Sequence, residues 1–224
     1  MKPLALVTGV GPGTGAAIAR RFSDGGYRVA MLARDADRLA ALAAEIPDSL
    51  AVPCDVSDPA ALQAAIERIG APKVVVHNAV GGAFGAFADI DPAVLERNFQ
   101  VNVMALLHLA RLTTPAMIEA GEGALIVTGN TSALRGRANF AGFAPTKAAQ
   151  RILAESIARD VGPKGVHVAY LVIDLAWTRA RYKDAPDDFF IQPADIAGEV
   201  FHLAHQPRTA WSFLSEVRPF RETW

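Results

Sequence analysis

Apolar residues follow two alternating patterns along this chain. Short, nearly continuous apolar runs predict buried strands, and the longer segments between them carry apolar residues at helical spacing. The predicted strands are Leu4–Thr8, Arg28–Ala33, Leu50–Cys54, Lys73–His77, Ala124–Gly129, Val166–Ile173 and Trp211–Val217. The predicted helices are Gly13–Ser23, Ala36–Ile46, Pro59–Ile69, Pro92–Ala120, Pro145–Val161 and Ala194–Ala204.

This alternation of strands and helices predicts an α/β fold. Right-handed crossovers give a doubly wound parallel sheet with helices on both faces. Val74, Val75 and Val76 are apolar in succession, as in a strand that is covered on both sides. No linker interrupts the 224 residues, so we predict a single domain over residues 1–224 with about seven strands. Pro145 would break a helix interior, so a helix should begin close to it.

Composition limits the partners that this chain can have. Hydrophobic residues make up 51% of it, the net charge is −1, and no run of like charge occurs. These features argue against nucleic-acid and membrane-surface partners and favour a small molecule. Cys54 is the single cysteine, so an internal disulfide is impossible. The apolar start is short and leads into a glycine motif, and no run approaches the ~20 apolar residues of a membrane span, so we expect a cytoplasmic protein.

A glycine-rich loop follows the first predicted strand and opens the first predicted helix. It reads Thr8-Gly9-Val10-Gly11-Pro12-Gly13-Thr14-Gly15. Glycines let the backbone approach a pyrophosphate, and the N-terminus of the helix stabilises its negative charge. The strand before the loop and the helix after it supply the context that this motif needs. A tight turn without a ligand is the alternative, and it must explain four glycines in seven residues.

The end of the second predicted strand bears on the choice of dinucleotide. It reads Ala33-Arg34-Asp35, whereas an NAD site usually has a carboxylate at the end of this strand. A neutral residue followed by arginine suits a 2′-phosphate, which favours NADP(H) over NAD(H). The alternative is that Arg34 only lies at a solvated strand end and that Asp35 caps the next helix.

Several motifs together resemble the short-chain dehydrogenase/reductase family. They are the glycine run, Asn78-Ala79, Asn102, and the segment Phe143 to Lys147. The resemblance implies a Rossmann-type sheet and assembly into a homodimer or homotetramer through the long helices. Asp55 resembles the family's aspartate beside the adenine, although read alone it is equally a turn residue or a helix cap. The implied cofactor-binding residues are Gly9, Gly11, Pro12, Gly13, Thr14, Gly15, Arg34, Asp55, Val56, Asn78, Ala79 and Lys147.

The catalytic segment departs from the family pattern. Family members carry tyrosine as the proton donor where this chain has Phe143, and serine thirteen positions earlier, where it has Asn130. Lys147 and Asn102 match the family's lysine and asparagine. A phenylalanine cannot donate a proton, and losing a general acid typically costs ~10²–10⁴ in rate. Substitute donors are Thr131, Ser132, Asp174 and Tyr182, and each also has a purely structural interpretation.

Two functions are compatible with this pattern. The first is an NADP(H)-dependent oxidoreductase that transfers hydride to or from a small apolar carbonyl, alcohol or imine. The second is a non-catalytic dinucleotide-binding protein, a sensor or an oligomer partner. We expect no metal site, because His202 and His205 have no third ligand near them in sequence. Aromatic residues that are expected to rim the substrate cleft, or to pack a lid or a subunit interface, are Phe84, Phe87, Trp177, Tyr182, Phe189 and Phe190.

Overall fold

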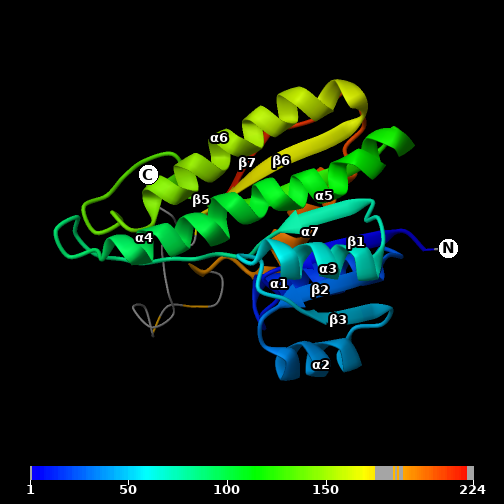
Figure 1. The fold of residues 1–224 in the computed structure, drawn as a ribbon, viewed down its shortest axis with the longest axis horizontal. Coiled ribbons are helices and arrows are strands. Elements are labelled where there is room, and N and C mark those ends of the chain that lie inside the picture. Colours follow the sequence, from blue (N-terminus) through cyan, green and yellow to red (C-terminus); the bar gives the residue numbers. More distant parts are fainter. Residues whose placement is uncertain (1, 175–183, 185, 187–188, 221–224) are drawn as a thin grey trace.

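The computed structural model describes residues 2–174, 184, 186 and 189–220. Its sheet has seven parallel strands in the order β3-β2-β1-β4-β5-β6-β7 (Figure 1). The α/β, doubly wound prediction is therefore confirmed. The strands are β1 (Leu4–Thr8), β2 (Arg28–Ala33), β3 (Ser49–Pro53), β4 (Val74–His77), β5 (Gly123–Asn130), β6 (Val166–Ile173) and β7 (Leu214–Val217).

The last strand is shorter than the pattern predicts. It begins at Leu214 rather than at Trp211. The Trp211 ring stacks on His167 at a centroid distance of 4.9 Å, and its indole N–H donates to the Gln206 carbonyl oxygen. Trp211 thus packs through its side chain, while the Phe213 carbonyl oxygen still accepts from the Tyr170 nitrogen of β6 at 2.6 Å.

Helices cover both faces of the sheet, and each face has its own apolar core. One cluster joins α3, α5 and α6 to the sheet, and the other joins α1, α2 and α7 to the opposite face (Figure 1). The two-sided burial explains the consecutive valines of β4. The helices are α1 (Thr14–Asp24), α2 (Ala36–Glu45), α3 (Pro59–Ile69), α4 (Pro92–Phe99), α5 (Ala105–Ala120), α6 (Ala144–Val161) and α7 (Pro193–Ala204), with short 3₁₀ turns η2 (Thr131–Ala133) and η3 (Gly162–Lys164).

The long helix predicted at 92–120 contains an irregularity. A π-helical turn, η1 (Gln100–Met104), joins α4 to α5 and carries the buried Asn102. By length and composition the segment Pro92–Ala120 is apolar enough to cross a membrane, but 44% of its most apolar window is buried inside the fold. The core helix of a soluble protein has the same properties. Single-turn π segments occur often at functional sites, which directs attention to Asn102.

Candidate active site

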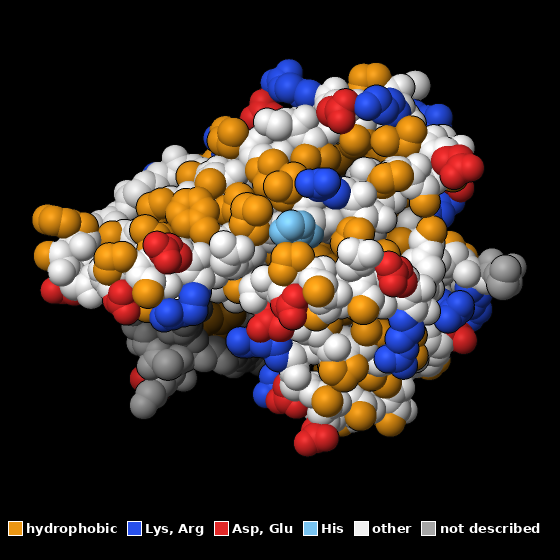
Figure 2. Space-filling model, viewed as in Figure 1, with side chains coloured by type: hydrophobic (Ala, Val, Ile, Leu, Met, Phe, Trp, Pro, Cys, Tyr) orange, Lys and Arg blue, Asp and Glu red, His pale blue; other side chains and the backbone are white. Residues whose placement is uncertain are grey.

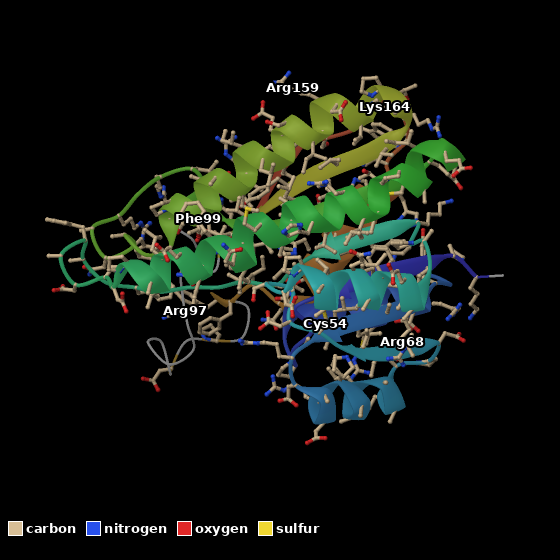
Figure 3. The ribbon with its side chains drawn as sticks, in the orientation of Figure 1. Cys54, Arg68, Arg97, Phe99, Arg159 and Lys164 are labelled. Carbon is tan, nitrogen blue, oxygen red and sulfur yellow. The ribbon has the colours of Figure 1, made fainter. Side chains whose placement is uncertain are left out.

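A large cleft opens at the carboxyl ends of the strands. It lies beside β1 and β4, where the strand order reverses and where ligands bind in sheets of this type. Its volume is about 1650 Å³, enough for a dinucleotide and a small second molecule. Cys54 and Arg97, both part of its lining, are labelled in Figure 3. The sequence-predicted residues in the lining are Gly9, Gly11, Gly13, Thr14, Gly15, Arg34, Asp55, Val56, Asn78, Ala79, Asn130, Phe143 and Lys147.

Two predicted residues lie outside this lining. Pro12 is exposed on the glycine loop, and Asn102 is fully buried behind the cleft. The Asn102 side chain forms a pair of hydrogen bonds with the Gly81 backbone, at 2.9 Å from the Gly81 nitrogen and 2.8 Å to its oxygen. It also donates to the Thr146 hydroxyl at 2.8 Å. Asn102 therefore ties the loop after β4 to the start of α6.

The glycines of the loop fall into two classes. Gly9 has φ +67°, and a Cβ placed there would lie 2.5 Å from the Ala79 Cα, while a Cβ on Gly15 would lie 2.7 Å from the Gly9 oxygen. These two glycines are required for packing. A Cβ on Gly11 or Gly13 would meet nothing within 4 Å, and α1 has no side-chain cap. The open backbone and the uncapped helix start suit a pyrophosphate.

Polar contacts hold the loop against the ends of β4 and β5. The Asn78 amide donates to the Gly9 oxygen at 3.0 Å and accepts from the Thr128 hydroxyl at 3.1 Å. The Thr8 hydroxyl oxygen accepts from the backbone of Asn78 and Ala79, at 3.2 and 3.3 Å. The contacts of Asn78 and Ala79 show that these residues join β1, β4 and β5.

A buried histidine completes this junction. Nδ1 of His77 lies 3.1 Å from the Thr8 hydroxyl. Because both lone pairs of the hydroxyl oxygen already accept from Asn78 and Ala79, we assign its hydrogen to Nδ1. Burial, and then the charge of Lys147, lower the pKa of His77 to about 3. Its Nε2 faces the carbonyls of Val101 and Asn102 without a hydrogen bond of normal geometry. His77 is therefore neutral at physiological pH and acts as a core residue.

Two arginines lie at the far end of the cleft. Arg34 directly follows β2, lines the cleft and makes no ion pair with any residue that the structure describes. Asp35 caps α2 by accepting from the Arg38 nitrogen at 3.0 Å, and its carboxylate pairs with the Arg38 guanidinium at 3.0 Å. Sequence reasoning missed Arg38, which also lines the cleft. Its position one helical turn after a capping aspartate was the available signal.

Asp55 is held as a turn residue at the end of β3. It accepts hydrogen bonds from the Ser57 nitrogen at 3.0 Å and from the Ser57 hydroxyl at 2.7 Å. These bonds, and then the charge of Arg34, lower the Asp55 pKa. Val56 is buried beside it, and Asp58, not Asp55, caps α3. Asp55 thus keeps its turn role while facing the cleft.

Lys147 lies at the floor of the cleft and is only 2% exposed. Its Nζ donates to the Thr128 oxygen at 3.1 Å and to the side-chain oxygen of Gln150. Burial lowers the pKa of Lys147 from 10.5 to about 7. The helix α6 that carries it begins at Ala144 beside Pro145, as predicted. An amine with this pKa at the base of a cleft is a typical functional group.

The substrate side of the cleft is aromatic. Phe143 is buried at the N-cap of α6, and its ring lies 5.3 Å from that of Phe84, which packs 5.2 Å from Phe140. Phe140 was missed by sequence reasoning. Phe87 does not line the cleft and is 87% exposed, so the prediction that it rims the cleft is wrong. Phe189 and Phe190 pack on each other at 5.3 Å, and Trp177 and Tyr182 lie outside the described residues.

Asn130 offers a hydrogen-bond donor to this part of the cleft. Its side-chain oxygen caps η2 by accepting from the Ser132 nitrogen at 3.1 Å. This contact orients the amide and leaves its NH₂ group without a partner among the residues that the structure describes. Thr131, Ser132 and Asp174, predicted as substitute proton donors, also line the cleft.

No metal centre accompanies these groups within the described part of the chain. Residues 2–174, 184, 186 and 189–220 contain no group of three or more His, Cys, Asp and Glu residues that could hold a metal ion. His205 stacks on Phe201 at 4.0 Å and contacts the Tyr27 hydroxyl at 3.0 Å. It is therefore engaged in packing.

Comparisons with known proteins agree with this geometry. A sequence model of the family described as short chain dehydrogenase matches residues 3–184. The chain belongs to the short-chain dehydrogenase family. A 7alpha-hydroxysteroid dehydrogenase of Escherichia coli (strain K12) is 31% identical over 92% of this chain and 88% of its own. A D-erythrulose reductase of Gallus gallus is 32% identical over 73% of this chain and 67% of its own.

A solved structure supports the same assignment. It is a metagenomic short-chain oxidoreductase in complex with NADP, with a TM-score of 0.85 and 31% identity, covering 97% of both chains. This short-chain dehydrogenase is therefore an oxidoreductase by family and has the fold of a nicotinamide dinucleotide enzyme.

Proposed function

We propose that this short-chain dehydrogenase uses NADP(H) to transfer hydride to or from a small apolar carbonyl, alcohol or imine. One observation carries the proposal: a single cleft joins the open backbone of Gly11 and Gly13, the two arginines Arg34 and Arg38, and the buried amine of Lys147. The glycine backbone suits a pyrophosphate, the two arginines suit the 2′-phosphate on one side of it, and Lys147 suits the nicotinamide ribose on the other.

The cofactor preference rests on the end of β2. Ala33 and Arg34 offer no carboxylate to the ribose hydroxyls, and the nearby Asp35 is occupied by α2 and Arg38. A 2′-phosphate would meet two guanidinium groups, which bind phosphate through paired N–H donors. The complex of the metagenomic relative with NADP is consistent with this choice.

The chemistry at the other end follows from the side chains that face the substrate. NADPH, when bound, supplies the hydride. Lys147 binds the ribose hydroxyls, Asn102 holds the wall formed by Gly81 and Thr146, and the Asn130 amide donates to the substrate oxygen or nitrogen. The packed rings of Phe143, Phe84 and Phe140 favour an apolar substrate. Phe143 supplies no proton, so a substrate that is already protonated, such as an iminium ion, needs least from the protein.

The non-catalytic alternative is favoured by one observation. Phe143 stands at the helix mouth where the family resemblance expects the proton-donating tyrosine, and no tyrosine lines the cleft among the described residues. Such a protein would bind the dinucleotide and gain stability from it without turnover.

A two-stage experiment separates these functions. Calorimetric titration with NADPH and NADH comes first, and we expect much tighter binding of NADPH. Oxidation of NADPH is then followed at pH 7 with cyclic imines, apolar ketones and apolar aldehydes. Turnover of any of these supports the enzyme, tight binding with no turnover supports the non-catalytic protein, and no binding of either dinucleotide contradicts both.

Assembly is part of the same proposal. Hydrophobic side chains gather over α4, α5 and α6 in the space-filling view (Figure 2), and Ile152 on α6 is 51% exposed. We propose a homodimer or homotetramer formed through these helices, as the family resemblance implies, and a cytoplasmic protein without a membrane or nucleic-acid partner. Light scattering after gel filtration would measure the mass in solution, and a monomer would contradict this part of the proposal.

A further inference from the structure

A buried polar network lies behind Lys147, on the side away from the cleft. Gln150 is one turn further along α6 and is fully buried, as are Asn102 on η1 and Tyr170 on β6. Each of the three elements contributes one group, and all of the groups meet at the Gln150 amide. Buried polar side chains at a shared point are costly unless every contact is satisfied.

The contacts fix which way the Gln150 amide points. Its nitrogen donates to the Asn102 carbonyl oxygen at 2.7 Å, and a carbonyl can only accept. The amide oxygen is therefore directed away from Asn102, where it accepts from the Lys147 amine and from the Tyr170 hydroxyl at 3.3 Å. The π-helical turn thus sets the position of an acceptor beside Lys147.

Lys147 needs such an acceptor. Its stem is long and flexible, and its ammonium group carries three N–H donors that lose water on burial. Among the described residues its hydrogen-bond acceptors are the Thr128 oxygen and Gln150. With these two contacts made, one N–H remains for a ligand in the cleft.

We propose that Gln150 is a positioning residue that links the π-helical turn to Lys147 and holds the Lys147 amine where it binds the cofactor ribose. The inference rests on the proposed dinucleotide binding and deepens it. Gln150 does not touch the cofactor itself. It acts by fixing the amine between two acceptors, so that binding does not have to order the lysine side chain.

Three other titratable groups belong to the surroundings of Lys147. His77 on β4 is neutral near pH 7, because its pKa is about 3. Tyr170 on β6 is also neutral, because burial raises its pKa. Asp174, which follows β6, lines the same cleft. Since His77 and Tyr170 are uncharged, changes of binding between pH 6 and 9 report on Lys147 and on the cofactor.

The test compares NADPH binding by the wild type, Gln150→Met and Gln150→Glu between pH 6 and 9.5. The ammonium form of Lys147 binds best, so wild-type affinity should fall as pH rises above about 7. Gln150→Met removes the acceptor, and we expect it to bind NADPH about tenfold or more weakly than the wild type. The pH above which its affinity declines should also be lower than in the wild type. Gln150→Glu places a carboxylate beside the Lys147 amine and favours the ammonium form, so the pH above which NADPH affinity declines should be higher than in the wild type.

The control variant is Thr113→Val, which removes a buried side-chain hydrogen bond in α5 away from the cleft. It should leave the pH profile unchanged, and the cofactor's own phosphate titrates equally in all variants. Unshifted profiles in both folded Gln150 variants would overturn the positioning role. If Gln150→Met does not fold, the Gln150→Glu variant alone tests the positioning role, through the direction in which its pH profile of NADPH binding shifts. Failure of the wild type to bind NADPH would instead overturn the proposed function.

Discussion

The two ends of the cleft solve different chemical problems. At the end that we propose for the pyrophosphate, recognition depends on missing side chains, since Gly11 and Gly13 leave the backbone open and Gly9 allows the loop to pass Ala79. At the end that we propose for catalysis, function depends on particular groups, and Phe143 lacks the one that proton transfer requires. Binding at the glycine loop therefore depends on the backbone conformation. The reaction at the other end can change when a single side chain is replaced.

The catalytic end is nevertheless highly ordered. Burial lowers the pKa of Lys147 to about 7, and its amine donates to Gln150, which is itself held by Asn102 and Tyr170. A buried, destabilising amine that is held by two acceptors and keeps one N–H for a ligand is a feature of functional sites. This order supports a working cleft in which a different group, or the substrate itself, supplies the proton.

The largest effect is expected from restoring the proton donor. In the double variant Phe143→Tyr with Asn130→Ser, the phenol would stand at the mouth of α6 near the Lys147 amine. We expect ketone reduction to rise by about 10²–10⁴, the usual contribution of a general acid. Initial rates of NADPH oxidation with an apolar ketone measure it. The single variant Asn130→Ser serves as the control, because it adds no general acid with a tuned pKa. A silent double variant would weaken the enzyme interpretation.

The next effect tests the packing role of the glycine loop. Gly9→Ala forces a Cβ to within 2.5 Å of the Ala79 Cα at φ +67°. We expect a loss of roughly 2–5 kcal/mol in the free energy of unfolding. Gly11→Ala is the matched variant, and it should keep that free energy while weakening NADPH binding, because its Cβ enters open space in the cleft. Urea unfolding and calorimetry measure the two quantities, and equal destabilisation by both variants would contradict the division into two classes.

The third effect concerns the charge of Lys147. Its pKa falls from 10.5 to about 7 on folding, so the unfolded chain binds more protons between these values. The wild type therefore gains stability as pH rises from 7 to 10.5 and is least favoured below pH 7. Lys147→Met removes this dependence, and its free energy of unfolding relative to the wild type should drop by roughly 2–3 kcal/mol from pH 6 to pH 9. If the difference in free energy of unfolding between Lys147→Met and the wild type did not depend on pH, burial would not lower the pKa of Lys147.

The smallest effect concerns the distinction between dinucleotides. Arg34→Ala removes a guanidinium from the end of β2, and we expect NADPH to bind about tenfold more weakly while NADH is little affected. Arg20→Ala, which breaks an exposed pair with Glu45 away from the cleft, is the control. Equal losses for both dinucleotides would falsify the assignment of Arg34 to a 2′-phosphate.

Local pattern was sufficient for most of the fold. Strand and helix positions, the parallel sheet, the glycine loop and the start of α6 beside Pro145 followed from periodicity and from the special backbone properties of glycine and proline. These properties depend on neighbours in sequence, so they can be read before the chain is folded.

Long-range contact decided the rest. The π-helical turn at Gln100–Met104 and the use of Gln150 as the acceptor for Lys147 depend on β4, β6 and α6 meeting behind the cleft. Gly129 likewise makes room for Tyr170, since a Cβ there would lie 2.1 Å from its ring. The sequence by itself determined the layers and the phosphate loop, because these follow from local backbone preferences. Only the tertiary structure decided which polar side chains share the buried space around Lys147, because that depends on which distant residues pack together.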